Sequence, residues 1–388
     1  MKKIGYIVSE FPVLTETFIT TEIRAMEKIG HNVQIIGFKK HKGKMQPSDD
    51  DLLEQSVFLD EIRLTDMIPI VFRLRFSSIA GLIFICKQKN LSKLSLLYSS
   101  LKLAFLASKY QCDHLHSHFA LSNTAAAIVA GKILNIPVSF VGHGFDIYVN
   151  PSDLREKLRF SSFAIAVCRD MADHFRNTSP SSRVNVVHCG VDTSRFKYMK
   201  EYRYKNNKIL FIGRLCEKKG LHELIMAIQK IPTPQRPYLD IVGDGGMRDQ
   251  LHLLIDKFNL NSYIKLLGSK SSNWLIDNAN SYRALVVPFK KAQNGDRDTG
   301  PVVVKEAMAM GIPVITTNFM GCKEIITEDC GIRVSPNNIH ELSRAIKTMM
   351  NLSEEKISLI RLKARKRIVE NFSDSKQAEM LSNLIELS

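Results

Sequence analysis

Short apolar runs alternate with helix-like windows along almost the whole chain. The runs are typical of buried β-strands, and between most of them apolar residues recur at the spacing of an amphipathic helix. The predicted strands are 4–8, 33–38, 113–116, 138–141, 164–167, 184–188, 209–212, 239–242, 264–267, 284–288, 314–317 and 332–334. Strands that alternate with helices form parallel sheets with helices on both faces, so we predict an α/β fold of the doubly wound, Rossmann-like kind.

The chain is long enough for two such domains. It has 388 residues, and a polar, basic run with no clear period interrupts the alternation near its middle. We predict an N-terminal domain over 1–192, a linker over 193–207, a C-terminal domain over 208–372 and a helix over 373–388 that crosses back to the N-terminal domain. The two domains are expected to face each other across a cleft at the carboxyl ends of their strands.

Composition argues against several classes of protein. The seven cysteines are scattered without a Cys-x-x-Cys pair, which is typical of free thiols in a reducing compartment. We recognise no secretory signal, and the most apolar window, 67–86, contains a proline and two arginines, so a membrane-spanning helix is not expected. The net charge is +15, but we find no nucleic-acid-binding motif and predict no nucleic-acid partner.

Residues 63–110 concentrate positive charge among apolar residues, with Asp66 as their single acid. A basic, apolar, helix-compatible segment is typical of a surface that binds an anionic membrane. The alternative is a helix pair whose apolar face packs on its own domain.

The segment 294–313 joins two predicted strands and places two carboxylates around the start of a helix. Asp298 and Glu306 lie eight positions apart, and Gly300-Pro301-Val302-Val303 lies between them. The free N–H groups and positive dipole end of a helix start favour phosphate, and carboxylates accept hydrogen bonds from hydroxyls. Phosphate together with hydroxyls describes a nucleotide sugar.

Two further strand ends carry cations or glycines. After strand 209–212, Gly213-Arg214 and then Lys219 provide two cations suited to phosphate, although a solvated turn is the alternative. After strand 239–242, Gly243 begins a loop that lacks the G-x-G-x-x-G spacing, so no dinucleotide site is predicted. That loop is either a structural turn or a ligand-facing segment.

Histidines gather at strand ends of the N-terminal half. His143 lies between two glycines after strand 138–141, a context that favours function, and Asp146 is placed to orient it or to cap the next helix. Alternation puts His114, His116 and His118 on one face of a strand. We find no acid or cysteine partner at suitable spacing and predict the wall of a cleft rather than a metal site.

The first strand leads into the first helix through Thr15, Glu16 and Thr17. The threonines are candidates to cap that helix and to contact substrate, and the two roles are compatible.

These motifs resemble those of the retaining GT-B glycosyltransferases known as glycosyl transferases group 1, over nearly the whole chain. Asp298 and Glu306 match the family's E-x7-E motif with Asp in place of the first Glu, and Arg214 and Lys219 match G-R-x-x-x-x-K-G. The Gly-Asp-Arg-Asp run at 295–298 and Thr-Glu-Thr-Phe-Ile at 15–19 resemble the branch that builds bacterial exopolysaccharide, colanic-acid-type and O-antigen chains of lipopolysaccharide.

The resemblance implies a GT-B fold and a hexosyltransferase-type enzyme. A sugar would pass, with retention at C1, from a nucleoside-diphosphate sugar to a lipid-linked saccharide acceptor in bacterial surface polysaccharide biosynthesis. A UDP-sugar is favoured over a GDP-sugar, and no metal cofactor is expected. The N-terminal domain would bind the acceptor and the C-terminal domain the donor. The protein would be cytoplasmic and peripheral on the cytoplasmic face of the inner membrane. A non-hydrolysing nucleotide-sugar epimerase and a non-catalytic sugar-nucleotide-binding subunit remain as alternatives.

The resemblance also implies roles for single residues. Glu306 would bind the ribose hydroxyls, Asp298 the sugar hydroxyls, and His143 would contact the donor sugar near its anomeric centre. Arg214 and Lys219 would hold the pyrophosphate and stabilise the leaving diphosphate. The other residues expected at the donor are Gly213, Gly243, Gly300, Pro301, Val302 and Val303, and those expected on the acceptor side are Thr15, Glu16, Thr17, His118 and Asp146.

Overall fold

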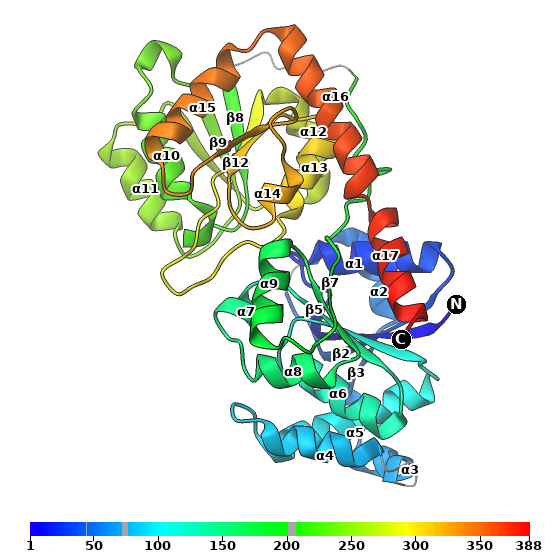
Figure 1. Ribbon diagram of the computed structural model, residues 1–388. Coiled ribbons are helices and arrows are strands. Elements are labelled where there is room, and N and C mark those ends of the chain that lie inside the picture. The colour runs from blue at the N-terminus through cyan, green and yellow to red at the C-terminus, as the bar shows by residue number, and fades with distance from the viewer. Residues whose placement is uncertain (44, 72–76, 201–206) are drawn as a thin grey trace. The chain divides into compact units, whose positions relative to one another are not determined.

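A computed structural model describes residues 1–43, 45–71, 77–200 and 207–388. The chain divides into two units (Figure 1), of which unit 1 comprises Met1–Gly190 with Asp374–Ser388 and unit 2 comprises Val191–Ser373. Each unit has its own sheet and its own hydrophobic core. Residues 201–206 of the predicted linker lie outside the described residues, and Phe196 is buried in the core of unit 2.

Unit 1 is built on a seven-stranded parallel sheet. Its strands are β1 (Lys3–Phe11), β2 (Asn32–Lys40), β3 (Val57–Phe58), β4 (His114–His118), β5 (Val138–Gly142), β6 (Phe163–Ala166) and β7 (Val184–Val186). They lie in the order β3-β2-β1-β4-β5-β6-β7, and all neighbours are parallel. The order reverses between β1 and β4, and doubly wound folds bind ligands at the carboxyl ends of the strands at such a reversal.

The helices of unit 1 form more than one layer. They are α1 (Thr17–Lys28), α2 (Asp50–Glu54), α3 (Ile68–Val71), α4 (Ser77–Lys87), α5 (Lys93–Lys109), α6 (Ser122–Leu134), α7 (Phe145–Tyr148), α8 (Leu154–Phe160), α9 (Arg169–Thr178) and α17 (Asp374–Glu386). Helix α6 packs against the sheet and is buried along most of its length. Helices α4 and α5 pack on α6, so they form an outer layer of the unit (Figure 1).

Helix α17 belongs to unit 1 although it follows unit 2 in the sequence. It lies beside α1 (red and blue in Figure 1) and buries Ala378, Leu381 and Ile385 completely. These three residues recur at helical spacing and form its apolar stripe. The start and the end of unit 2 lie side by side, because the Val191 N–H donates to the carbonyl of Phe372 at 3.0 Å.

Unit 2 repeats the architecture with six parallel strands in the order β10-β9-β8-β11-β12-β13. The strands are β8 (Lys208–Ile212), β9 (Tyr238–Val242), β10 (Ile264–Gly268), β11 (Ala284–Val287), β12 (Val314–Thr317) and β13 (Ile332–Val334). The helices are α10 (Leu221–Gln229), α11 (Arg248–Lys257), α12 (Ser272–Asn278), α13 (Val302–Met310), α14 (Cys322–Ile325), α15 (Ile339–Asn351) and α16 (Glu354–Asn371). Here the strand order reverses between β8 and β11.

Each strand predicted from the sequence has a counterpart in the structure, and the two-residue β3 is an addition. The expectation of apolar strands is wrong for β4, whose five residues include three histidines and are all buried. Among the described helices, none combines the length and the apolar character needed to cross a bilayer.

Candidate active site

Two loops of unit 2 meet where the strand order reverses. The short helix η4 (Glu217–Lys219) follows β8, and the loop between β11 and α13 carries Asp296 and Asp298. The ammonium group of Lys219 lies 2.5 Å from the carboxylate of Asp298, and that of Lys218 lies 3.0 Å from the carboxylate of Asp296. The fold thus joins residues 79 and 78 positions apart into two adjacent ion pairs.

Asp298 is an ionised carboxylate in this setting. Burial disfavours its charged form, but the positive charges of Lys219 and Lys218 outweigh burial and lower the pKa of its carboxyl. The Lys219 ammonium also lies 5.0 Å from the ring centre of Phe289. The pair therefore offers a cation and a hydrogen-bond acceptor side by side.

Helix α13 begins at Val302 with Pro301 at its N-cap, and Glu306 lies in its second turn. The first N–H groups of the helix, including those of Val302 and Val303, have no partner within a helix of this kind. Burial raises the pKa of Glu306 to about 7, and the positive charges of Arg195 and Lys305 offset only part of this effect. Glu306 thus exchanges its proton near neutral pH.

The loops that follow β8 and β9 touch through the backbones of two glycines. A Cβ at Gly243, where φ is 143°, would lie 1.9 Å from the carbonyl oxygen of Gly213. Only glycine permits this approach. The contact between the two loops therefore accounts for glycine at position 243. Arg214 follows Gly213 in the first loop, and its side chain is exposed.

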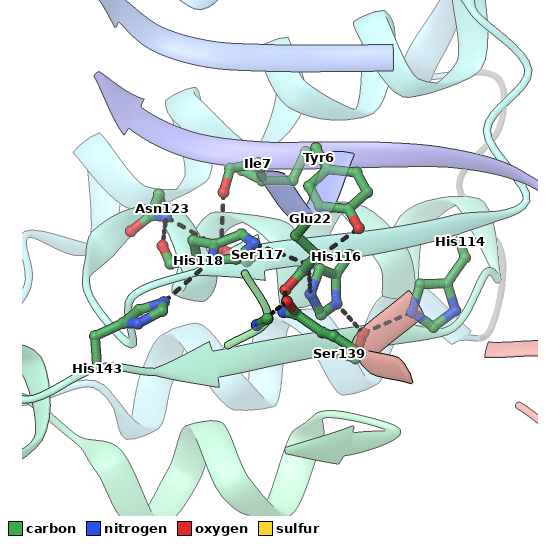
Figure 2. A network of polar contacts seen from close by, with 12 residues as sticks. Tyr6, Ile7, Glu22, His114, His116, Ser117, His118, Asn123, Ser139 and His143 are labelled. Atoms are coloured by element: carbon green, nitrogen blue, oxygen red, sulfur yellow. Dashed lines mark hydrogen bonds and ion pairs between the residues drawn. The ribbon is translucent and has the colours of Figure 1, made fainter. Parts of the chain in front are cut away.

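A second cluster of polar side chains lies in unit 1 along β1, β4 and β5 and extends to the loop after β5 (Figure 2). His118 Nδ1 is 3.1 Å from His143 Nε2, and His118 Nε2 is 3.1 Å from Oε1 of Glu22 on α1. Glu22 also accepts hydrogen bonds from the Tyr6 hydroxyl, at 3.0 Å, and from the side-chain amide of Gln377 on α17. The two histidines predicted for the site are therefore linked to a carboxylate that sequence reasoning missed.

Glu22 could have been found from one signal in the sequence. It occupies the buried face of α1 together with Ile19, Ile23 and Met26. A carboxylate at an apolar position of an amphipathic helix needs a partner, because burial of an unpaired charge is costly. Its partner His118 lies 96 positions away, so the sequence could not identify it.

The two ends of the Glu22–His118–His143 chain differ in charge. Burial opposes the ionisation of Glu22, but His118 and His116 outweigh burial and hold the pKa of Glu22 well below its usual range. Burial, together with the charge of His118, places the pKa of His143 well below that of a free histidine. Glu22 is therefore ionised and His143 neutral at neutral pH.

Glu22, His116 and His118 offer three donor atoms within 4.8 Å of one another, which is a possible metal site. The expectation that no acid accompanies these histidines is wrong. The carboxylate already accepts hydrogen bonds from three side chains, and His116 Nδ1 pairs with Ser139 Oγ at 2.7 Å (Figure 2). A metal ion at this site would need the histidine nitrogens that face Glu22 without protons, and it would compete with the hydrogen bonds that the carboxylate already accepts.

Asp146 orients the loop that carries His143. One carboxylate oxygen accepts hydrogen bonds from the N–H groups of Gly144 and His143 at 2.9 and 3.1 Å, and the other from that of Ala120 at 2.7 Å. Asp146 is fully buried and connects the ends of β4 and β5. The N-cap of α1 is Glu16, whose side chain makes no capping hydrogen bond, so the predicted threonine cap is wrong and Thr17 is the first helical residue.

Two protein families match the chain in succession. The family described as Glycosyltransferase Family 4 matches residues 15–195, and the family described as Glycosyl transferases group 1 matches residues 194–371. Both families are glycosyltransferases, and together the two matches span residues 15–371, so the chain is a glycosyltransferase. The class of enzyme predicted from the sequence is thereby confirmed.

The glycosyltransferase resembles known proteins over its whole length. WcaL from Escherichia coli (strain K12), named for colanic acid biosynthesis, is 24% identical over 412 residues and covers 99% of each chain. The structure of a glycosyltransferase from Rickettsia africae ESF-5 covers 100% of this chain and 98% of its own, with a TM-score of 0.76 and 18% identity. The structure of Anabaena Alr3699/HepE in complex with UDP covers 100% of both chains, with a TM-score of 0.75 and 18% identity. The predicted GT-B fold, with two Rossmann-like domains, is confirmed.

Proposed function

We propose that this glycosyltransferase transfers a sugar, with retention at C1, from a nucleoside-diphosphate sugar to a lipid-linked saccharide in bacterial surface polysaccharide biosynthesis. The observation that carries the proposal is the 2.5 Å pair of Lys219 and Asp298 at the reversal of strand order in unit 2. It combines a cation for a departing diphosphate with an acceptor for sugar hydroxyls. The likeness to WcaL supports the polysaccharide class, and the UDP complex of the HepE structure supports a UDP-sugar over a GDP-sugar.

The donor would be held from three sides in unit 2. Arg214 and Lys219 bind the pyrophosphate, and the first N–H groups of α13 add the positive end of its dipole. Glu306 accepts hydrogen bonds from the ribose, and Asp298 from the sugar. Lys219 is paired with Asp298 before a donor binds, so its charge is already in position when the diphosphate leaves.

In the reaction the acceptor oxygen bonds to C1 as the bond from C1 to the phosphate oxygen breaks. The proton of the acceptor hydroxyl passes to the departing diphosphate on the same face of the sugar, which retains the configuration. No metal takes part in the proposed step, because Arg214 and Lys219 carry the compensating charge.

The proposed acceptor is lipid-linked, and α4 offers a surface for a peripheral contact with the inner membrane from its cytoplasmic side. Ile79, Leu82 and Ile83 are each about half exposed on one side of α4, whereas Phe84 and Ile85 on the other side are buried. An apolar face with lysines nearby suits an anionic lipid surface. Arg73 and Arg75, which contribute to the predicted basic segment, lie outside the described residues.

Incubation of the purified protein with UDP- and GDP-sugars and lipid-linked saccharides tests the proposal. Transfer with the α- or β-configuration of the donor preserved supports it, and NMR of the product reads the configuration. Interconversion of the nucleotide sugar without acceptor would instead indicate an epimerase, and binding alone a non-catalytic subunit. A thermal-shift comparison of UDP, GDP, ADP and CMP identifies the base, since bound ligand raises the unfolding temperature.

A further inference from the structure

We propose that Glu217 and Lys290 are positioning residues that hold the loop between β11 and α13 where Asp298 meets the donor. Residues 288–301 form this donor loop, which carries Asp298. The inference rests on the proposed contact of Asp298 with the donor sugar. Neither Glu217 nor Lys290 is assigned a contact with substrate, and both act through the position of Asp298.

The donor loop lies entirely within the described residues and contains no helix or strand of its own. Ordering an irregular segment costs conformational entropy, so it stays in one conformation only where other contacts offset that cost. A site must hold the groups that contact a substrate to within about 0.5 Å. The position of Asp298 therefore depends on contacts between the rest of the loop and its own unit.

The first anchor of the loop lies where the chain leaves β11. A Cβ at Gly220, where φ is 70°, would lie 1.9 Å from the carbonyl oxygen of Pro288, so the two backbones are in direct contact. The N–H of Lys290 donates to the carbonyl of Lys218 at 2.9 Å. The Lys290 ammonium lies 2.7 Å from Oε1 of Glu223 on α10, and the two side chains are 15% and 13% exposed. Water therefore screens this ion pair less than it screens a surface pair.

The second anchor lies in the middle of the loop. Oε2 of Glu217, from η4, accepts a hydrogen bond from the backbone N–H of Gln293 at 3.0 Å. The loop turns back on itself here, because the Gly295 N–H donates to the carbonyl of Ala292 at 3.0 Å and the Ala292 N–H to that of Asp296 at 2.8 Å. Glu217 thus holds the turn that lies just before the proposed sugar contact.

Both anchors attach the loop to the segment 217–223, which also carries Lys219. The ammonium of Lys219 lies 2.5 Å from the carboxylate of Asp298, and contacts within the protein itself maintain this spacing. Charged groups that are already in place need no rearrangement as the transition state forms, which is the condition for strong electrostatic stabilisation. The anchors therefore support transfer by preorganising the pair.

The variants Glu217→Ala and Glu217→Gln test the second anchor. Alanine removes the acceptor of the Gln293 N–H, so that amide should exchange its hydrogen about tenfold faster, and kcat/KM for the nucleotide sugar should fall by about tenfold. The amide oxygen of glutamine still accepts the hydrogen bond, so Glu217→Gln should stay within about threefold of wild type in both measurements. The affinity for UDP should change little in either variant, because UDP lacks the sugar that Asp298 is proposed to contact.

The double variant Glu223→Gln with Lys290→Met tests the first anchor. The second oxygen of Glu223 is buried and has no hydrogen-bond partner among the described residues, so loss of Lys290 alone would leave an unpaired carboxylate and destabilise the fold. The double variant removes both charges and should remain folded. Its kcat/KM should fall by about tenfold while its affinity for UDP is retained.

The matched control for the double variant is Lys291→Met. Lys291 is the next residue in the loop, is exposed, and forms no hydrogen bond or ion pair with the residues that the structure describes. Its kcat/KM and its affinity for UDP should equal those of wild type.

A purely structural role for the anchors would lower the unfolding temperature and weaken UDP binding together with transfer, and that result would overturn the inference. So would wild-type exchange at Gln293 in Glu217→Ala, a Glu217→Gln protein as impaired as Glu217→Ala, wild-type kcat/KM in the folded double variant, or an equal loss in Lys291→Met. Hydrogen exchange and UDP binding are measured without transfer. Absence of transfer with every nucleotide sugar would therefore count against the proposed function, whereas unchanged exchange at Gln293 would count against the positioning role alone.

Discussion

Lys219 is the residue on which the proposed chemistry depends most directly. Lys219→Ala removes a cation that is already within 2.5 Å of Asp298, and we expect kcat to fall by about 100-fold or more, since pre-placed charge is among the largest contributions to catalysis. The variant should remain folded, because the nearby charge of Lys218 also favours ionised Asp298. Steady-state kinetics with the preferred nucleotide sugar measures the effect.

Lys218→Ala provides the control for Lys219, because Lys218 forms a similar ion pair with Asp296 in the same loop. It should cost much less activity. Equal losses in the two variants would mean that general positive charge, rather than the position of Lys219, supports transfer, and full activity of a folded Lys219→Ala protein would remove the pyrophosphate assignment.

Glu306 makes stability depend on pH in a direction opposite to that of most carboxylates. Burial raises its pKa to about 7 in the folded protein, whereas the unfolded chain has the ordinary value of about 4.3. The folded state therefore binds the proton more tightly, and the contribution to stability is full below the unfolded value and lost as pH rises through about 7. Relative to Glu306→Gln, the wild type should lose unfolding temperature between about pH 5 and pH 8.

Thermal unfolding of both proteins across that range measures the difference. If the unfolding temperatures of the two proteins changed with pH in parallel, Glu306 would titrate like an exposed carboxyl. The effect on transfer is separate, because Glu306→Ala is expected to abolish activity through loss of the ribose contact while the fold persists.

At the residue scale the sequence predicted Asp298 and Glu306 of unit 2 and Asp146 of unit 1 as site residues, but it did not predict Glu22. Asp298 and Glu306 lie in one short segment, so their separation along the chain indicates that they lie close to the same helix start. The contacts of Glu22 are with His118 and Gln377, which are far away in sequence, and no local sequence pattern predicts such contacts. The same limit explains why the pairing of Lys219 with Asp298 was not predicted, although both residues were.

At the scale of single elements, α4 has an apolar face that the described residues leave about half exposed. Leu82 and Ile83 are 54% and 47% exposed. Leu82→Glu together with Ile83→Glu should greatly reduce co-sedimentation with vesicles that contain anionic lipid, because it replaces apolar contact by negative charge. The unfolding temperature should change little, since both side chains are already about half exposed.

Leu359→Glu is the control for the α4 variant. Leu359 is 53% exposed on α16 of unit 2, and the substitution changes charge without touching α4. Its binding to the same vesicles should resemble that of wild type. Undiminished binding of the α4 variant would show that α4 is not the membrane contact.

Helices and strands could be predicted where their burial is reflected in the local sequence. Every described strand of more than two residues overlaps a predicted run, and for the strands other than β4 the reason is that parallel strands covered on both faces are mainly apolar in sequence. The strand β3 was not predicted, because two residues are too few to show a periodic sequence pattern. β4 was found, but its interior surroundings were not, since buried histidines satisfy each other through Ser139, Glu22 and His143 rather than through apolar contacts.

At the scale of the whole molecule, two separate cores imply two units that respond differently to ligand. The core of unit 2 is built around β8 to β13, and donor binding is proposed for that unit. UDP should therefore raise the transition of unit 2 in calorimetry, by about 2.7 kcal/mol at a hundredfold excess over Kd, and leave the transition of unit 1 nearly unchanged. Asp298→Asn, which keeps the shape of a sugar contact, should show a similar shift with UDP.

A shift confined to the transition of unit 1 would contradict the assignment of the nucleotide to unit 2. The alternation of strands and helices predicted both sheets because it recurs in each half of the chain. The sequence did not reveal which face of α17 is buried against α1, since that packing joins opposite ends of the chain.

The contact between Gln377 and Glu22 has a consequence for folding during synthesis on the ribosome. The two residues are separated by 355 positions, so Glu22 emerges and begins to fold long before its amide partner exists. All of unit 2 must be translated before α17 can dock on α1. The polar cluster around Glu22 is therefore completed only in a chain that has been made through α17, and a protein that terminates early would have the histidines without the Gln377 amide that donates to their carboxylate partner.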